Sequence, residues 1–232
     1  MKSILLFIVG IFAGYVLLAN KNGFNATNRT NQREKNKLEN DRYGNYDPGK
    51  DKKFSLEERT YFNKIAKISE FSGDCEISRW TSDIKIFVKG EKRDYLMFEL
   101  KKIINELNGI INPINLLIVD SEEESNYQIL FGTQSEYNDF KPSSKEHTPK
   151  NWGLFIIDSG REIESGSMYV DIYRCEDKNG QKHLLREELT QSLGLTNDSY
   201  DYPESVFYQK WTETTEYSPL DRRLIEMLYN HW

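Results

Sequence analysis

The stretch "HLLREELTQSLGLTND", residues 183–198, decides the fold of this chain. Its apolar residues recur at helical spacing as far as Gly194, and glycine is the residue expected just past a helix C-terminus. His183, Glu187 and Gln191 follow one another at intervals of four, so one face of the helix carries all three. This row indicates either a metal or proton site, or a simple His–Glu hydrogen bond at the start of a partly exposed helix.

Five short segments before this helix are β-branched or continuously apolar, as strands are. They are residues 83–90, 114–120, 127–132, 153–158 and 167–174. A helix with regularly spaced apolar residues, 94–110, separates the first two segments, and a last helix begins at Ser218 with Pro219 in its first position. Tight links between the later strands require some antiparallel pairing. The sequence therefore predicts an α+β domain with a five-stranded mixed sheet, a crossover helix and a C-terminal helix.

The N-terminus has a different character. Residues 4–19 contain no charge, which predicts a signal peptide or a short signal anchor within residues 1–20. If the segment is not cleaved, residues 4–19 hold the chain at a membrane. In either case we expect the polar remainder to lie outside the cytoplasm, in the periplasm, at the cell surface or secreted.

Two more segments precede the domain. Residues 21–54 are rich in Asn, Lys and Asp and poor in aliphatic side chains, so we expect a disordered linker. Residues 55–72 show helical periodicity, with Ser55 and Glu58 as a capping box, and form a short helical lead-in. The folded domain then spans residues 73–232.

Composition limits the classes of partner. The formal net charge is −6 and no basic stripe stands out, so the sequence argues against nucleic-acid binding. The cysteines, Cys75 and Cys175, form either one disulfide, which an exported chain permits, or two separate buried thiols. The oligomeric state is not encoded in any recognisable pattern.

The stretch at 183–198 resembles the zinc-binding helix of zinc proteases, the zincins, whose pattern is H-E-x-x-H and in a longer form continues x-x-G-x-x-H/D. In this frame Glu188 fills the position of the catalytic glutamate and Gly194 that of the glycine. The three metal-ligand positions hold Glu187, Gln191 and Asn197 instead of histidines.

The resemblance extends to the end of the chain. The order of strands and helices is similar to that of metzincin catalytic domains, in which the fourth strand is an antiparallel edge strand and the fifth leads to the active-site helix. Residues 205–211, "SVFYQKW", resemble the metzincin turn, with Phe207 in the place of its methionine. Residues 218–229 resemble the closing helix.

The segment 79–229 as a whole looks like a bacterial zincin-like family of unknown function, whose hallmark is a Glu-Glu-x-x-Gln helix followed by Leu-Gly-Leu and Asn-Asp. The "EELTQSLGLTNDS" stretch is similar to that hallmark. Asn197 and Asp198 are expected to cap or turn the chain below the helix.

Ligand chemistry argues against a catalytic zinc. Such a zinc needs about three strong protein ligands and an open position for water. Gln191 and Asn197 offer only neutral amide oxygens, which suit harder cations better. We therefore expect no metal and no cofactor, and zinc-dependent peptidase activity is not expected, although enzymatic activity of another kind stays open.

Three functions remain. The first is an exported or membrane-anchored pseudoenzyme that binds an extended peptide or protein along its edge strand. The second is a peptidase-like hydrolase that uses Glu188 and Gln191, with Glu187 as an alternative acid, or a non-zinc metal held by Glu187 and His183. The third is a structural envelope component whose cleft is filled by its own side chains.

Overall fold

The fold is that of a computed structural model, which describes residues 4–6, 53–66, 77–158 and 161–230. Within these ranges, the residues from Glu57 onward and the N-terminal strand belong to one compact unit. Most of the apolar N-terminal run, residues 21–52 of the expected linker, and Cys75 lie outside the described residues. The predictions made for them therefore stay predictions.

The five strands predicted from the sequence form one mixed sheet. They are β3 (Ile84–Gly90), β4 (Leu116–Ile118), β5 (Tyr127–Gly132), β6 (Gly153–Asp158) and β8 (Gly166–Asp171). A short strand, β1 (Ile4–Leu6), extends the sheet, and the strand order is β1-β6-β8-β5-β3-β4. The strands β4, β3, β5 and β8 run parallel, and β6 is antiparallel to β8. A separate parallel pair joins β2 (Arg79–Trp80) to β7 (Glu162–Ile163).

One expectation about the sheet needs correction. We expected residues 153–158 to be the edge strand, but β1 lies outside β6 and pairs with it antiparallel. The pairing joins Ile4 to Asp158, Leu5 to Ile157 and Leu6 to Ile156. An edge strand presents unpaired backbone groups, so it accepts a further strand readily.

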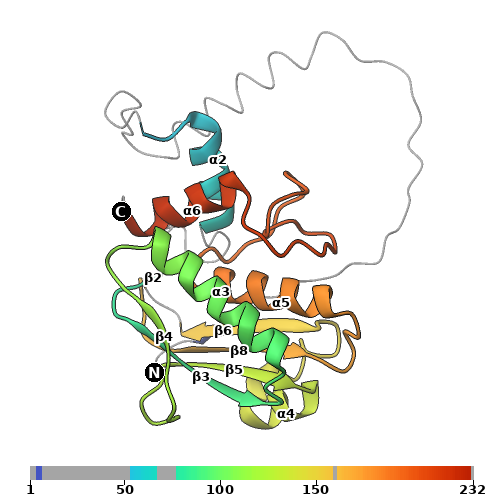
Figure 1. The fold of residues 1–232 in the computed structure, drawn as a ribbon. Coiled ribbons are helices and arrows are strands. Elements are labelled where there is room, and N and C mark those ends of the chain that lie inside the picture. Colours follow the sequence, from blue (N-terminus) through green and yellow to red (C-terminus); the bar gives the residue numbers. More distant parts are fainter. Residues whose placement is uncertain (1–3, 7–52, 67–76, 159–160, 231–232) are drawn as a thin grey trace, which may run out of the picture. The chain divides into compact units, whose positions relative to one another are not determined.

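Helices cover both faces of the sheet. The helices are α2 (Leu56–Ala66), α3 (Asp94–Ile110), α4 (Gln134–Phe140), α5 (Lys178–Gln191) and α6 (Pro219–Asn230), with a 3₁₀ turn, η1, at Pro142–Ser144. Figure 1 shows α3 and α5 side by side on one face, with α4 against the other. Tyr137 of α4 is buried there with Tyr169 and Leu154.

The helix that decides the fold begins earlier than its apolar pattern predicts. Asp177 is its N-cap, and the carboxylate accepts a hydrogen bond from the Gly180 backbone N–H at 2.6 Å. The polar run before His183 therefore forms a first turn rather than a loop. Gly180 is required in it, because a Cβ there would lie 2.8 Å from the Trp211 ring. His183 consequently lies in the second turn and is only 2% exposed, so the expectation of a partly exposed helix start is wrong.

The end of α5 and the start of α6 agree with the sequence. Gly194 has φ +119°, and a Cβ there would lie 2.0 Å from the Ser78 carbonyl oxygen, so only glycine fits. Ser218 caps α6 by accepting a hydrogen bond from the Asp221 backbone N–H at 3.1 Å. The chain therefore turns sharply below α5 and returns through α6.

Two further expectations concern the membrane and the cysteines. Within the described ranges, no helix has both the length and the apolar character needed to cross a membrane. Cys175 is a buried, free cysteine, but Cys75 lies outside the described residues, so both alternatives for the cysteines stay predictions.

Candidate functional site

The candidate site is built on the second half of α5. Its Glu187, Glu188 and Gln191 are 5%, 0% and 0% exposed. The helix packs against β6 and β8 on one side and against α3 on the other. The acidic pair and the amide are thus placed between the sheet and the loops that follow the helix.

Glu188 lies directly against β6. A Cβ on Gly153 would come within 2.7 Å of the Glu188 Oε1 atom, so glycine is needed where the strand begins. Neither carboxyl oxygen of Glu188 has a partner at standard hydrogen-bond geometry among the described residues. Burial, followed by the nearby Asp198, raises the pKa of Glu188, and a hydrogen bond from the Phe155 backbone opposes the rise. The protonated, neutral form of the Glu188 carboxyl group is therefore favoured.

Gln191 and Asp198 form a second polar contact. The Gln191 amide nitrogen donates to the Asp198 Oδ1 atom at 2.5 Å, whereas the Gln191 Oε1 atom has no partner among the described residues. Burial raises the pKa of Asp198 to about 7, although the Gln191 hydrogen bond works in the opposite direction. Asp198 thereby joins the polar group on α5.

Asn197, the third position of the zincin frame, faces elsewhere. Its backbone N–H donates to the Ile65 carbonyl at 3.0 Å, and its side-chain amide donates to the Lys64 carbonyl at 3.2 Å. Both acceptors belong to the end of α2. Asn197 thus joins the lead-in helix to the domain, while its neighbour Asp198 faces the helix α5.

His183 and Glu187 contact each other on α5. The His183 Nδ1 atom donates to the Thr214 carbonyl at 2.8 Å, which leaves Nε2 without a proton in the neutral ring. That Nε2 atom lies 3.4 Å from the Glu187 Oε2 atom. Burial lowers the pKa of His183 and raises the pKa of Glu187, and Asp198 and Glu188 raise the latter further. Both side chains are therefore stabilised in their neutral forms.

Phe207 anchors the turn below the site. It is fully buried, and its carbonyl accepts a hydrogen bond from the Ser199 backbone N–H at 2.9 Å. The Ser205 hydroxyl accepts from the Phe207 N–H at 3.1 Å and donates to the Asp221 carboxylate at 2.6 Å. Since Ser199 follows Asp198 directly, the turn and α6 together fix the loop that carries Asp198.

The structure brings most of the sequence-predicted residues together. His183, Glu187, Glu188, Gln191 and Asp198 gather along α5, with Gly194 and Phe207 shaping the chain beneath them. Asn197 is directed away from them. Across the described ranges, no group of three or more His, Cys, Asp or Glu side chains is arranged to hold a metal ion.

Sequence reasoning missed the aromatic mouth of the site. A small pocket, partly open to solvent, borders α5. Its wall is formed by residues 151–153 of the β6 start, by His183, Leu184, Glu187 and Glu188 of α5, and by residues 208–211. The Trp152 and Trp211 rings meet edge to face with centroids 5.7 Å apart. No sequence signal links two tryptophans so far apart in the chain.

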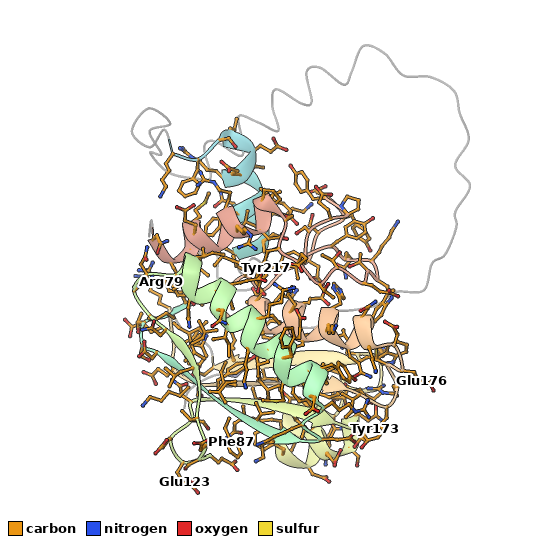
Figure 2. The ribbon with its side chains drawn as sticks, in the orientation of Figure 1. Arg79, Phe87, Glu123, Tyr173, Glu176 and Tyr217 are labelled. Carbon is orange, nitrogen blue, oxygen red and sulfur yellow. The ribbon has the colours of Figure 1, made fainter. Side chains whose placement is uncertain are left out.

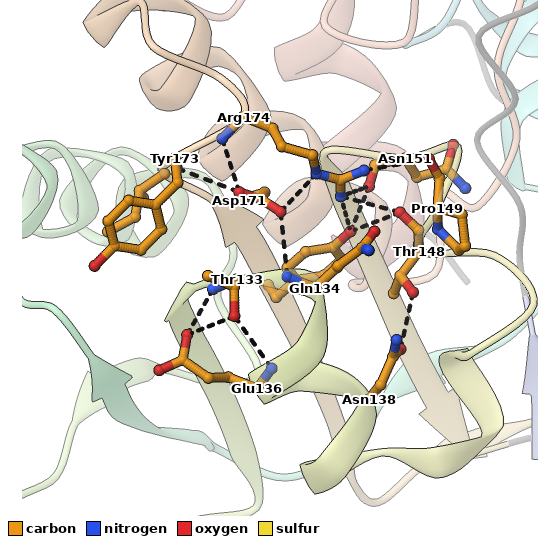
Figure 3. Close-up of polar contacts among 12 residues, drawn as sticks. Thr133, Gln134, Glu136, Asn138, Thr148, Pro149, Asn151, Asp171, Tyr173 and Arg174 are labelled. Atoms are coloured by element: carbon orange, nitrogen blue, oxygen red, sulfur yellow. Dashed lines mark hydrogen bonds and ion pairs between the residues drawn. The ribbon is translucent and has the colours of Figure 1, made fainter.

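Arg174 positions one wall of this pocket. Its guanidinium donates to the Thr148 and Asn151 carbonyls at 3.0 and 2.8 Å, and to the Asp171 carboxylate at 2.7 Å. Figure 3 shows how these bonds join the end of β8 to the loop that precedes Trp152. Arg174 is a positioning residue, because it holds that loop without reaching the pocket itself.

A buried ion cluster fixes the opposite side of α5. The Arg186 guanidinium is 0% exposed and donates to Glu99 and Glu106 of α3, each at 2.8 Å. Its carbon Cζ lies 4.4 Å from the centre of the Tyr217 ring, which Figure 2 shows at the junction of α3, α5 and α6. The sequence signal for this cluster was the seven-residue interval between the two glutamates, which places both on one face of α3.

Among solved structures, two of myroilysin are similar to this chain at 13% and 12% identity, with TM-scores of 0.39 and 0.40. Each match covers 66% of this chain and 83% or 86% of the other. A search of curated proteins found no match.

A family model matches residues 57–231, which include the lead-in helix, the sheet and the polar group on α5. Its printed description is "Protein of unknown function (DUF2927)". The match covers most of the chain, from the helix α2 to the end of α6. The chain therefore belongs to the DUF2927 family of proteins of unknown function.

Proposed function

We propose that this chain is a zincin-like domain that works without catalytic zinc and binds an extended peptide along the outer edge of β6. We also propose that it acts outside the cytoplasm, exported or anchored through the uncharged run at residues 4–19. The order of strands and the glutamate and glycine of the helix frame support the zincin-like assignment.

The added strand on β6 carries the proposal. The Asp158 N–H donates to the Ser165 carbonyl, and the Asp171 N–H donates to the Trp152 carbonyl. The even-numbered residues of this segment therefore direct their backbone N–H and C=O groups toward β8. The backbone groups of Ile157 therefore face outward, toward Leu5. An extended segment of this chain already pairs there, which supports β-strand addition as the mode of recognition.

The position of the pairing leaves room for a longer ligand. The described β1 covers only Ile156–Asp158, whereas the first residue of β6, Gly153, lies against Glu188 and the pocket. A peptide that continues along the strand would pass the polar group on α5. If the N-terminal segment is cleaved or inserted in a membrane, the whole edge is open to such a ligand.

The donor set supports the zinc-free part of the proposal. Gln191 could offer a metal only its neutral amide oxygen, which is a weak ligand for zinc, and the Asn197 side chain donates to α2 instead of facing the polar group. Glu187 contacts His183 in a buried place that favours its neutral form, and zinc requires deprotonated ligands.

The alternative of a hydrolase has weaker support. Glu188 would have to accept a proton from water, yet burial raises its pKa and favours the protonated acid. The Gln191 amide, which would stabilise an oxyanion, already donates to Asp198. A purely structural role is the outcome if no peptide binds.

Peptide binding by strand addition has a direct test on the full chain. We expect a blocked hexapeptide of alternating Val and Thr to displace β1 and so to shift the backbone amide NMR signal of Ile157. N-methylation of every second residue removes the N–H groups on one peptide edge. We expect methylation on the bonding edge to weaken binding at least about tenfold, and methylation on the other edge to have little effect.

A pair of variants adds a control from the protein side. Leu5 faces Ile157, so Leu5→Pro should release β1 and strengthen peptide binding, because proline cannot donate to the ladder. The Leu6 N–H points away from β6, because backbone groups alternate along a strand. Leu6→Pro therefore removes no hydrogen bond to β6 and is the matched control. Equal binding of both methylated peptides, or no binding to either variant, would rule out strand addition at β6.

A further inference from the structure

The pocket beside α5 has an aromatic mouth above a buried acidic floor. Trp152 and Trp211 are 37% and 40% exposed, so parts of both rings face solvent. The His183 ring packs edge to face against Trp211, with centroids 6.0 Å apart. Glu187 and Glu188 line the same pocket below them.

The acidic floor lacks a counter-charge. Among the described residues, no lysine or arginine forms an ion pair with Glu187, Glu188 or Asp198. The Glu188 side chain is 0% exposed, and among the described residues no side chain donates a hydrogen bond to its oxygens at standard geometry. Lys210 lines the rim and is exposed, where its positive charge weakly opposes a bound cation.

Such a site suits a planar organic cation. Tryptophan offers the strongest cation–π face, and a guanidinium both stacks on aromatic rings and pairs with a carboxylate in a fork. An ammonium is a compact charge that lacks the flat, forked geometry, and a metal ion needs oxygen, nitrogen or sulfur ligands that the tryptophan rings do not supply. Trp152 and Gly153 lie at the start of β6 and line the pocket. A peptide strand paired with this end of β6 would therefore place one of its side chains at the pocket.

We propose that this pocket binds the guanidinium of an arginine side chain, stacked against Trp152 and Trp211 and paired with Glu187, which releases its proton to solvent when the cation binds. The inference rests on the proposed function, because the arginine would belong to the peptide bound along β6. The arginine pocket would give the protein a preference for certain peptide sequences, whereas strand addition alone recognises only the peptide backbone.

Small molecules test the pocket apart from the strand. The probes are n-propylguanidinium and its uncharged analogue n-propylurea, added to the full chain. We expect the cation to shift the indole N–H signals of Trp152 and Trp211 and to bind about tenfold tighter than the urea. Trp80 is an internal control, because its indole N–H is buried and donates to the Ser192 carbonyl at 3.0 Å.

Peptides distinguish a bound side chain from a free cation. The Val/Thr hexapeptide is made with one arginine, or with citrulline, which is its uncharged analogue. We expect the arginine peptide to bind at least about tenfold tighter than the citrulline peptide. Equal binding of the two peptides would overturn the pocket while leaving strand addition intact. Binding of n-propylguanidinium with no binding of either peptide would keep the pocket and overturn the proposed function.

Variants assign the contact to its residues. Glu187→Gln keeps the shape and the contact with His183 but removes the ionisable group, so the preference for arginine over citrulline should vanish. Glu204→Gln, at an exposed glutamate outside the pocket, is the matched control and should keep it. Lys210→Gln should strengthen cation binding, which gives a second readout if Glu187→Gln does not fold. An unchanged preference in Glu187→Gln, or weaker binding in Lys210→Gln, would overturn the assignment.

Discussion

Arg186→Leu is expected to lower the free energy of unfolding by about 3–5 kcal/mol, because it leaves the buried Glu99 without its partner and the half-buried Glu106 with only the more distant Arg222. Glu99 and Glu106 each accept a hydrogen bond from Arg186 at 2.8 Å, and Glu99 is 3% exposed. Leucine also removes the contact with the Tyr217 ring. Urea unfolding at neutral pH, followed by far-UV circular dichroism, measures the change.

Arg223→Leu is the matched control, since Arg223 also pairs with two glutamates. Its side chain is 30% exposed, and it lies 2.8 Å from Glu58 and 2.7 Å from Glu226. Ion pairs that stay partly in contact with water contribute less than buried ones, so the expected loss is under about 1 kcal/mol. Combining Arg186→Leu with Glu99→Leu and Glu106→Leu should recover much of the stability, since no buried charge then stays unpaired. Equal losses for Arg186→Leu and Arg223→Leu would refute the buried cluster.

Glu188→Gln is expected to be increasingly stable relative to the natural chain as the pH rises from 5 to 8. Burial raises the pKa of Glu188 in the folded state above its unfolded value. Its contribution to stability is therefore fully present below the unfolded pKa and is lost as the pH rises toward the folded pKa. Glutamine does not titrate, so the stability difference grows by at most about 1.4 kcal/mol per pH unit.

Other groups also titrate between pH 5 and 8. The informative quantity is therefore the difference in stability between Glu188→Gln and the natural chain at each pH. Asp198, with a pKa raised to about 7, and Glu187 act in the same direction as Glu188. His183 acts in the opposite direction, because its lowered pKa removes stability as the pH falls. Urea midpoints of both proteins at pH 5, 6, 7 and 8 isolate Glu188. A difference that stays constant with pH would show that Glu188 is not held as a neutral acid.

The order of elements could be predicted from the sequence because local patterns determine it. The strands of the mixed sheet, the crossover helix α3 and the cap of α6 all have periodicity or capping signals of their own. The helix α4 was missed although its capping box, Thr133 with Glu136, was visible. The start of α5 was missed because an Asn-Gly pair is typical of a turn, whereas the Asp177 cap and packing against Trp211 stabilise it as helix.

The site could be predicted only where its residues share one helix. The row of His183, Glu187 and Gln191 follows from helical spacing, and the structure shows His183 beside Glu187. The choice of Asp198 rather than Asn197 as the partner of Gln191 depends on how the loop leaves α5, which α2 and α6 determine through tertiary contacts. The meeting of Trp152 with Trp211 likewise depends on two loops folded over the sheet.

The zinc content of the purified full chain tests the central claim most directly. Imidazole and thiolate ligands give zinc sites their affinity, and the frame positions on α5 and after it hold Glu187, Gln191 and Asn197. We expect elemental analysis to find far less than one zinc per chain, and a strong chelator to leave the melting temperature unchanged. One tightly held zinc per chain, lost together with thermal stability in His183→Ala, would contradict the account and indicate a rearranged metallohydrolase.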